Sequence, residues 1–104
     1  MKSKVEIMMK KLAKLGVFRQ EGEKFYLMLP FDLFFRGHLA KRLIENPDPL
    51  KIETYINESI IEALNNYNFF QEAKTEEEII LALKILRMYL KEEQIEKLVK
   101  ELAK

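Results

Sequence analysis

The first strong pattern in the chain is an amphipathic helix that begins near its amino terminus. Apolar residues recur every three or four positions from residue 5 to residue 15, which is the spacing of one face of an α-helix. Ser3 and Glu6 have the spacing of a capping box, in which each side chain accepts a hydrogen bond from the other residue's backbone amide. Gly16 follows the last apolar position and suits the left-handed conformation that ends helices. The pattern predicts a helix over residues 4–15.

The next segment favours β-structure. Two runs of β-branched, aromatic and aliphatic residues, 17–18 and 25–29, flank a charged stretch in which Gly22 suits a turn position with positive φ. We expect a β-hairpin over residues 17–29 that packs on helices, because an isolated two-stranded hairpin is only marginally stable. The second run is apolar at successive positions. This predicts a strand that is covered on both faces.

Prolines and capping residues divide the following sequence into four more predicted helices. Pro30 ends the second strand, and Pro47 and Pro49 separate the next two helices. Thr75 opens a second capping box. The phase of the apolar positions changes near Lys91, which indicates a break there. The predicted helices span residues 31–45, 49–67, 76–90 and 92–103.

Three local expectations accompany these helices. Gly37 lies inside the helix predicted over residues 31–45, where it either allows close approach of another backbone or marks a break. Residues 79–90 are apolar nearly all round, which predicts the most buried helix. Phe69 and Phe70 are expected to lead into a loop. The fold class that follows is mainly α, with four or five helices and one β-hairpin near the N-terminus, in a single domain over residues 1–104.

The composition is that of a globular protein, since 48% of the residues are hydrophobic and 34% are charged. Cysteine is absent, which excludes a disulfide framework and thiolate chemistry. No apolar run approaches the length of a membrane span, and no apolar stretch of signal-peptide type follows the first lysines. We therefore expect a cytoplasmic protein without a membrane partner. The abundance of Lys and Glu is typical of hyperthermophile proteins.

Charge divides the chain into two halves of opposite sign. Residues 1–42 carry ten Lys and Arg against four Asp and Glu, whereas residues 43–104 carry eight against thirteen. The basic half favours contact with nucleic acid or an acidic protein surface, while a mixed-charge solvated surface is the alternative. The acidic half could offer such a surface to a second copy. The candidate nucleic-acid-binding residues are Lys4, Lys11, Lys14, Arg19, Lys24, Arg36, Lys41 and Arg42.

The order of motifs near the amino terminus points in the same direction. Residues 12–18 are Leu-Ala-Lys-Leu-Gly-Val-Phe, a helix end, and residues 21–27 are Glu-Gly-Glu-Lys-Phe-Tyr-Leu, a hairpin with a charged glycine turn. Over residues 4–28 this order resembles the recognition helix and wing of winged-helix DNA-binding domains. The resemblance implies DNA contacts from both elements. A winged helix has two further helices before its recognition helix, so the fold would have to be permuted or completed by a partner chain.

A cluster of aromatic residues opens the second predicted helix. Phe31, Phe34 and Phe35 lie beside Leu33, and one helix cannot bury all four side chains on a single face. Either these rings fill the core or some of them dock a partner. Self-association would cover the excess in a chain with a small core. Phe31, Phe34 and Phe35 are therefore the candidate interface residues.

Residues suited to catalysis or cofactor binding are scarce. His38 is the single histidine, Ser3 is explained as a cap, and Ser59 lies on a packing stripe. A lone histidine gives no metal-ligand spacing, and three separated glycines form no phosphate-binding loop. We expect no catalytic site, metal or cofactor.

The leading hypothesis is a small non-enzymatic binding or assembly module, associated with nucleic acid through its basic half. The alternatives are a homodimerising structural protein without a nucleic-acid role and, third, a small enzyme whose site the sequence does not reveal.

Overall fold

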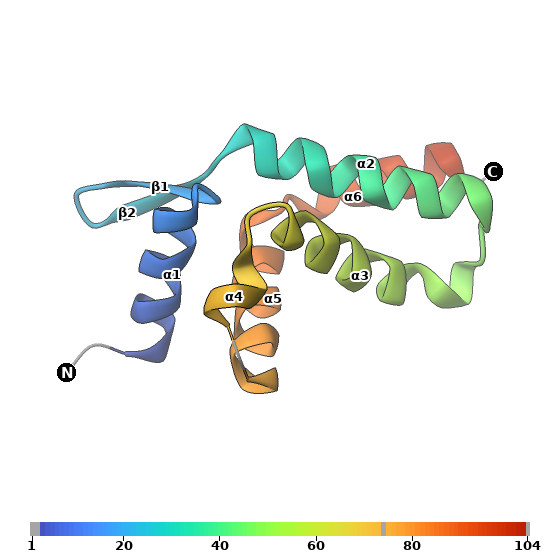
Figure 1. Cartoon of the computed structure of the whole chain (residues 1–104). Helices are drawn as coiled ribbons and strands as arrows, with labels where there is room; N and C mark the ends of the chain where they lie inside the picture. Colours follow the sequence, from blue (N-terminus) through green and yellow to red (C-terminus); the bar gives the residue numbers. More distant parts are fainter. Residues whose placement is uncertain (1–2, 74, 104) are drawn as a thin grey trace.

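The computed structural model describes residues 3–73 and 75–103 and confirms a mainly helical fold with one β-hairpin near the N-terminus (Figure 1). Strands β1 (Phe18–Glu21) and β2 (Lys24–Leu27) form the antiparallel hairpin, in which Phe18 pairs with Leu27. The α-helices in the described residues are α1 (Lys4–Leu15), α2 (Leu29–Glu45), α3 (Ile52–Asn65), α4 (Phe69–Glu72), α5 (Glu76–Tyr89) and α6 (Glu92–Leu102).

The helices form two groups in an elongated molecule of 47 × 27 × 20 Å. Helices α2 and α3 run side by side in opposite directions, and α6 packs against α2 from the far side in this view (Figure 1). Helix α1 lies beside α5, crosswise to α2, and carries the hairpin at its end. The hairpin and α1 therefore occupy one end of the molecule, while the second half of α2 reaches the other end.

The sequence signals at the amino terminus act as expected. The backbone N–H of Glu6 donates to Ser3 Oγ at 3.1 Å, which caps α1. Gly16 has a φ of 95° and ends the helix. Gly22 has a φ of 62° and turns the hairpin. These glycines adopt a left-handed conformation that side chains with a Cβ rarely tolerate. The predicted helix over residues 4–15 is confirmed at both ends.

Helix α2 begins earlier than predicted and is continuous through Gly37. Pro30 lies in the first turn of α2, where a backbone N–H would have no hydrogen-bond acceptor within the helix. The proline therefore begins the helix as well as ending the strand before it. No atom lies within 4 Å of where a Cβ on Gly37 would stand. Gly37 is therefore neither a break nor a site of close backbone contact within the chain. A 3₁₀ turn, Pro49–Lys51, precedes α3, and Asp48 caps it.

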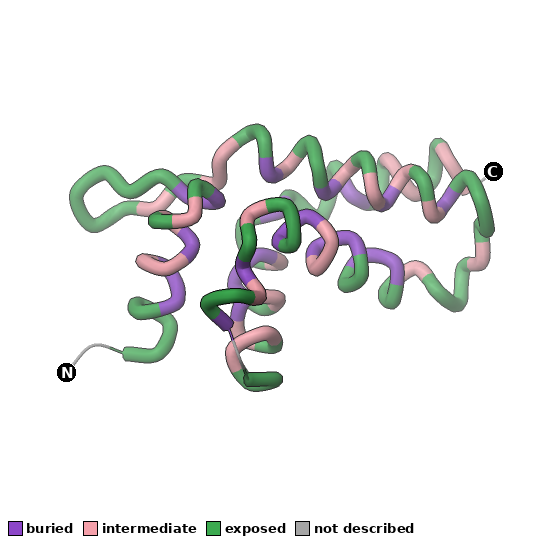
Figure 2. Tube along the Cα trace, in the orientation of Figure 1, coloured by how far each residue is buried: buried purple, intermediate pink, exposed green. Residues whose placement is uncertain are grey.

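The core lies between α2 and α3 and extends to α1 and α5 (Figure 2). Its centre is a row of fully buried side chains spaced four residues apart on α2: Phe31, Phe35, Leu39 and Leu43. Helix α3 contributes six buried residues and α5 only three, so the prediction that α5 is the most buried helix is wrong. Met88 of α5 is 82% exposed.

Two further sequence predictions are corrected. Strand β2 alternates between exposed and half-buried residues, so one of its faces is open to solvent instead of covered. Phe69 and Phe70 begin the short helix α4 instead of a loop, because Asn68 adopts a left-handed conformation with a φ of 58° that redirects the chain. No helix in the described part of the chain combines the length and apolarity that crossing a membrane requires.

Candidate nucleic-acid interface

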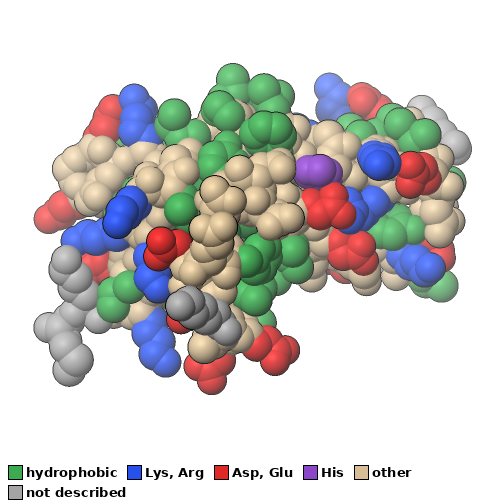
Figure 3. Space-filling view, viewed as in Figure 1, with side chains coloured by type: hydrophobic (Ala, Val, Ile, Leu, Met, Phe, Trp, Pro, Cys, Tyr) green, Lys and Arg blue, Asp and Glu red, His purple; other side chains and the backbone are tan. Residues whose placement is uncertain are grey.

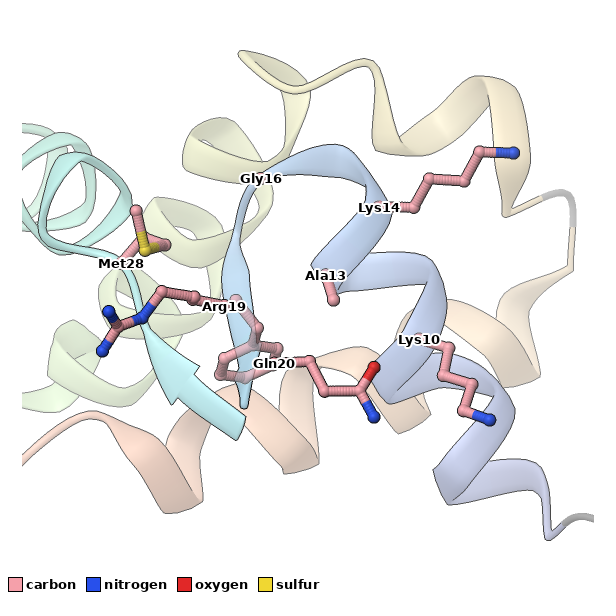
Figure 4. Close-up of a pocket in the computed structure, with 8 residues that line it drawn as sticks. Lys10, Ala13, Lys14, Gly16, Arg19, Gln20 and Met28 are labelled. Carbon is pink, nitrogen blue, oxygen red and sulfur yellow. The ribbon is translucent and has the colours of Figure 1, made fainter. Parts of the chain in front are cut away.

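A concave surface lies between the second half of α1 and strand β1 (Figure 4). It is a shallow depression of about 640 Å³, and no acidic side chain is among the described residues that line it. Lys10 and Lys14 extend from successive turns of α1 on one side, and Arg19 extends from β1 on the other. Its lining residues are Lys10, Ala13, Lys14, Gly16, Phe18, Arg19, Gln20 and Met28.

Burial of the apolar faces of α1 and β1 fixes this arrangement. Met8 and Leu12 bury the opposite side of α1, which leaves Lys14 exposed. Phe18 is 2% exposed, and its ring centroid lies 4.7 Å from that of Tyr89 on α5. Because successive strand residues point to opposite faces, anchoring Phe18 directs Arg19 away from the core.

Arg19 is positioned by two contacts on the exposed face of the hairpin. Its guanidinium lies 5.3 Å from the centroid of the Tyr26 ring, its cross-strand partner, in a cation–π contact. Arg19 Nη1 also lies 2.9 Å from Glu21 Oε1. Both side chains of this ion pair are 56% exposed, so the pair is weak and open to exchange with another anion. These contacts hold the Arg19 side chain outward, and its charge remains accessible to solvent.

The exposed lysines of the candidate set divide by location. Lys4, Lys14 and Lys24 lie on α1 and the hairpin, and Lys41 lies on α2. None of these has an ion-pair partner among the residues that the structure describes. Lys11 pairs with Glu78 of α5 at 3.6 Å. Figure 3 shows that basic side chains over α1 and the hairpin alternate with acidic ones, whereas the described residues that line the depression include no acidic side chain.

The two arginines of α2 belong to ion-pair networks within the protein. Arg36 Nε lies 3.0 Å from Asp32 Oδ1, and Arg36 Nη2 donates to Gln94 of α6. Arg42 pairs with Glu62 and Glu58 of α3, and its hydrogen bond to Glu62 raises the pKa of the guanidinium. These arginines fasten α2 to its neighbours.

The eight candidate cations do not form one surface. Five lie on α1 and the hairpin, whereas Arg36, Lys41 and Arg42 follow α2 toward the other end of the molecule (Figure 1). The eight cations therefore do not share one face of the molecule. The three cations of α2 lie far from the hairpin because α2 is straight and each successive residue lies about 1.5 Å further along its axis.

His38 joins the same network and not a cluster of metal ligands. Its Nδ1 lies 2.9 Å from Glu62 Oε2. The hydrogen bond from Arg42 lowers the pKa of the Glu62 carboxyl, and the neighbouring His38 and Lys41 act in the same direction. Across residues 3–73 and 75–103, no group of three His, Cys, Asp or Glu side chains is arranged to hold a metal ion.

The candidate interface aromatics separate into core and surface. Phe31 and Phe35 are 0% exposed, so they fill the core and offer no surface to a partner. Phe34 is 46% exposed and meets the Tyr67 ring edge-on at a centroid distance of 6.1 Å. Burial raises the pKa of the Tyr67 hydroxyl. Of the three rings, only Phe34 is accessible.

Six residues that line the depression lie outside the candidate set drawn from the sequence: Lys10, Ala13, Gly16, Phe18, Gln20 and Met28. Strand alternation alone would have assigned Gln20 to the covered face, yet it is exposed because the sheet has only two strands. Lys10 also pairs with Glu6 at 3.9 Å. The cross-strand register, which pairs Arg19 with Tyr26, was the signal that could have identified the cation–π contact.

Comparison of the chain with protein-family models, curated proteins and solved structures found no match.

Proposed function

We propose that this protein is a small non-enzymatic binding module that contacts the phosphate backbone of nucleic acid through the α1–hairpin surface. The observation that carries the proposal is the depression flanked by Lys10, Lys14 and Arg19, whose lining has no acidic side chain among the described residues. Lysine and arginine are the usual partners of backbone phosphates, and such contacts position a protein without reading sequence. The cytoplasmic location expected from the sequence stays a prediction.

The shape of the surface favours the phosphate backbone of nucleic acid over a small molecule as the ligand. The depression is shallow and open, whereas small-molecule sites are enclosed. Its cations lie on two elements on either side of it, which suits a ligand with repeated negative charges. Lys24 adds a further exposed cation at the hairpin turn.

The alternative function is that of a structural interaction protein with no nucleic-acid role. The specific observation in its favour is the exposed apolar surface of α2, where Leu33 is 59% exposed and Ile44 is 66% exposed. That surface lies on a different element from the depression, so the two surfaces can be tested separately.

The proposal is tested by fluorescence anisotropy with a labelled single strand and a labelled duplex of mixed sequence over a range of salt concentrations. We expect binding at low salt that weakens linearly in a plot of log affinity against log salt. Replacing Lys14 and Arg19 together by Gln should reduce the slope by about two and the affinity at low salt by about tenfold.

The matched control replaces Lys97 and Lys100 of α6 by Gln, which removes the same charge from exposed positions on a different helix. This control should bind like the unmodified chain. An equal loss in both double variants would show that only net charge matters. Absence of binding at low salt, with binding to an acidic polypeptide instead, would assign the surface to a protein partner and overturn the nucleic-acid proposal.

A further inference from the structure

Helix α2 presents an apolar stripe to solvent on the side opposite its buried row. Figure 3 shows hydrophobic side chains gathered over the first half of this helix. Leu33, Phe34 and Ile44 are 59%, 46% and 66% exposed, although the helix has a fully buried face of its own. The outer stripe of α2 consists of Pro30, Leu33, Phe34, Gly37, Lys41 and Ile44.

We propose that the outer stripe of α2 packs against the same stripe of a second copy, antiparallel, with the two helices crossing at Gly37. Gly37 lies at the centre of the stripe, and apart from its own stretch of helix no described part of the chain lies within 4 Å of where its Cβ would be. A glycine at this point lets two helix backbones approach closely. The interface is isologous, because a two-fold axis through Gly37 pairs residue i of one copy with residue j of the other and j with i, and brings the two Gly37 residues together.

The sizes of the side chains match under this symmetry. The axis places Leu33 opposite the partner's Lys41 and Pro30 opposite the partner's Ile44. The large apolar residues Leu33 and Phe34 lie on the N-terminal side of Gly37, while Ala40 and Lys41 lie on the other side. Each copy therefore offers a small or flexible side chain where the other offers a large one. The alkyl stem of Lys41 covers Leu33, and its ammonium reaches the face of Phe34.

Charge also favours the antiparallel arrangement. The N-terminus of α2 has no side-chain cap, since its N-cap residue is Met28. The two-fold axis places the partner's Glu45 near that terminus, where the free backbone N–H groups and the helix dipole attract a carboxylate. Neither Glu45 nor Lys41 has an ion-pair partner within the part of the chain that the structure describes. Both charged side chains are thus available to the second copy.

The area of the outer stripe of α2 limits the affinity of the proposed dimer. The stripe from Pro30 to Ile44 is about 21 Å long, and pairing it would bury on the order of 1,000–1,200 Å² in total, at the low end for specific interfaces. We therefore expect a dimer that forms at micromolar concentration and dissociates on dilution. The surface of α5 is less suited, because its exposed Ile80 and Met88 are separated by Lys84.

Sedimentation equilibrium of the full chain tests the association. The weight-average mass should rise from the 12.4 kDa of one chain toward twice that value as the concentration increases. Leu33→Glu places a charge in the stripe and should weaken the association at least about tenfold. Leu50→Glu is the matched control, since Leu50 is 94% exposed on the 3₁₀ turn outside the stripe, and it should leave the association unchanged.

Disulfide trapping tests the crossing point, because the chain contains no cysteine. Gly37→Cys should give a covalent dimer under mild oxidation, since the two introduced thiols meet at the axis. Ile44→Cys should not, because antiparallel helices hold those two positions about 21 Å apart. A chain that stays monomeric throughout, an equal effect of Leu33→Glu and Leu50→Glu, or equal trapping at both positions would overturn the proposal.

Discussion

At the scale of single residues, the two neighbouring rings Phe34 and Phe35 have opposite roles. Phe35 is fully buried, whereas Phe34 is 46% exposed. Phe35→Ala should lower the free energy of unfolding by about 3–5 kcal/mol, because it leaves a cavity in the core, and Phe34→Ala should lower it by about 1 kcal/mol or less. Urea denaturation followed by circular dichroism at low protein concentration measures both values.

Phe35→Leu keeps the prediction testable if Phe35→Ala does not fold, since it deletes fewer atoms and should cost about 1–2 kcal/mol. Similar losses for Phe34→Ala and Phe35→Leu would contradict the burial of these rings.

Gly37 is the position where a substitution should stabilise the folded chain. It lies in the interior of α2, it is exposed, and open space surrounds the place of its missing Cβ. Gly37→Ala should raise the free energy of unfolding by about 0.5–1 kcal/mol through helix propensity alone. Denaturation at two protein concentrations separates this gain from any effect on self-association, because only the latter depends on concentration. A loss of stability at both concentrations would show that the site is constrained.

The sequence predicted residue roles well where the signal was local. The row from Phe31 to Leu43 follows from a spacing of four residues, and the cap at Ser3 follows from its neighbours. The sequence could not predict that Glu62 pairs with Arg42, because Glu62 lies on another helix, 20 residues further along the chain. The tertiary contact, and not the basic character of the segment, decides which cations are available to a ligand.

At the scale of elements, the network of Arg42, Glu62 and His38 links α2 to α3 and should make stability depend on pH. The pKa of Glu62 is lowered in the folded chain, chiefly by its hydrogen bond from Arg42. Such a carboxyl stabilises the fold at pH values above its ordinary pKa, and this contribution is lost as the pH falls through the lowered value. Because the Glu62 side chain is 45% exposed, we expect a contribution of at most about 1 kcal/mol.

Glu62→Gln measures this contribution. Its free energy of unfolding should lie below that of the unmodified chain at neutral pH, and the difference should shrink as the pH falls below the ordinary range of carboxyl groups. Urea denaturation at several pH values gives the difference directly. Glu72→Gln, at an exposed position of α4, is the control and should show no such trend. A difference that is constant with pH would exclude an ionic origin.

Sequence patterns predicted the helices whose ends carry caps or prolines, and they failed where a neighbour decides the outcome. Helix α5 is apolar nearly all round, yet Met88 is 82% exposed because α1 and α3 cover only part of its surface. Strand β2 is apolar at successive positions, yet Tyr26 is exposed because no described helix or strand covers that face of the hairpin. Both errors have one physical cause, since an apolar pattern records a need for burial and not the partner that provides it.

At the scale of the whole molecule, the two proposed surfaces lie on different elements. The depression belongs to α1 and β1, whereas the outer stripe belongs to α2. The division of charge along the sequence predicted a basic surface but not its extent, because α2 carries Arg36 and Arg42 away from the hairpin and into contact with acidic partners. The basic surface of one chain is therefore small, and a second copy would double it.

This separation predicts that pairing through α2 strengthens binding to long nucleic acid without changing the contact made by each chain. With a strand long enough to meet both copies, Leu33→Glu should weaken binding by at least about tenfold, because the second contact is no longer tethered to the first. With a strand that spans only one copy, Leu33→Glu should bind like the unmodified chain. The variant with Lys14 and Arg19 replaced by Gln should instead bind both strands weakly and form an unchanged dimer in sedimentation. Anisotropy titrations with the two strand lengths, made above and below the dimer dissociation constant, distinguish these cases. Equal weakening of both strand lengths by Leu33→Glu would mean that the outer stripe itself touches nucleic acid, since a purely tethering role leaves the short strand unaffected.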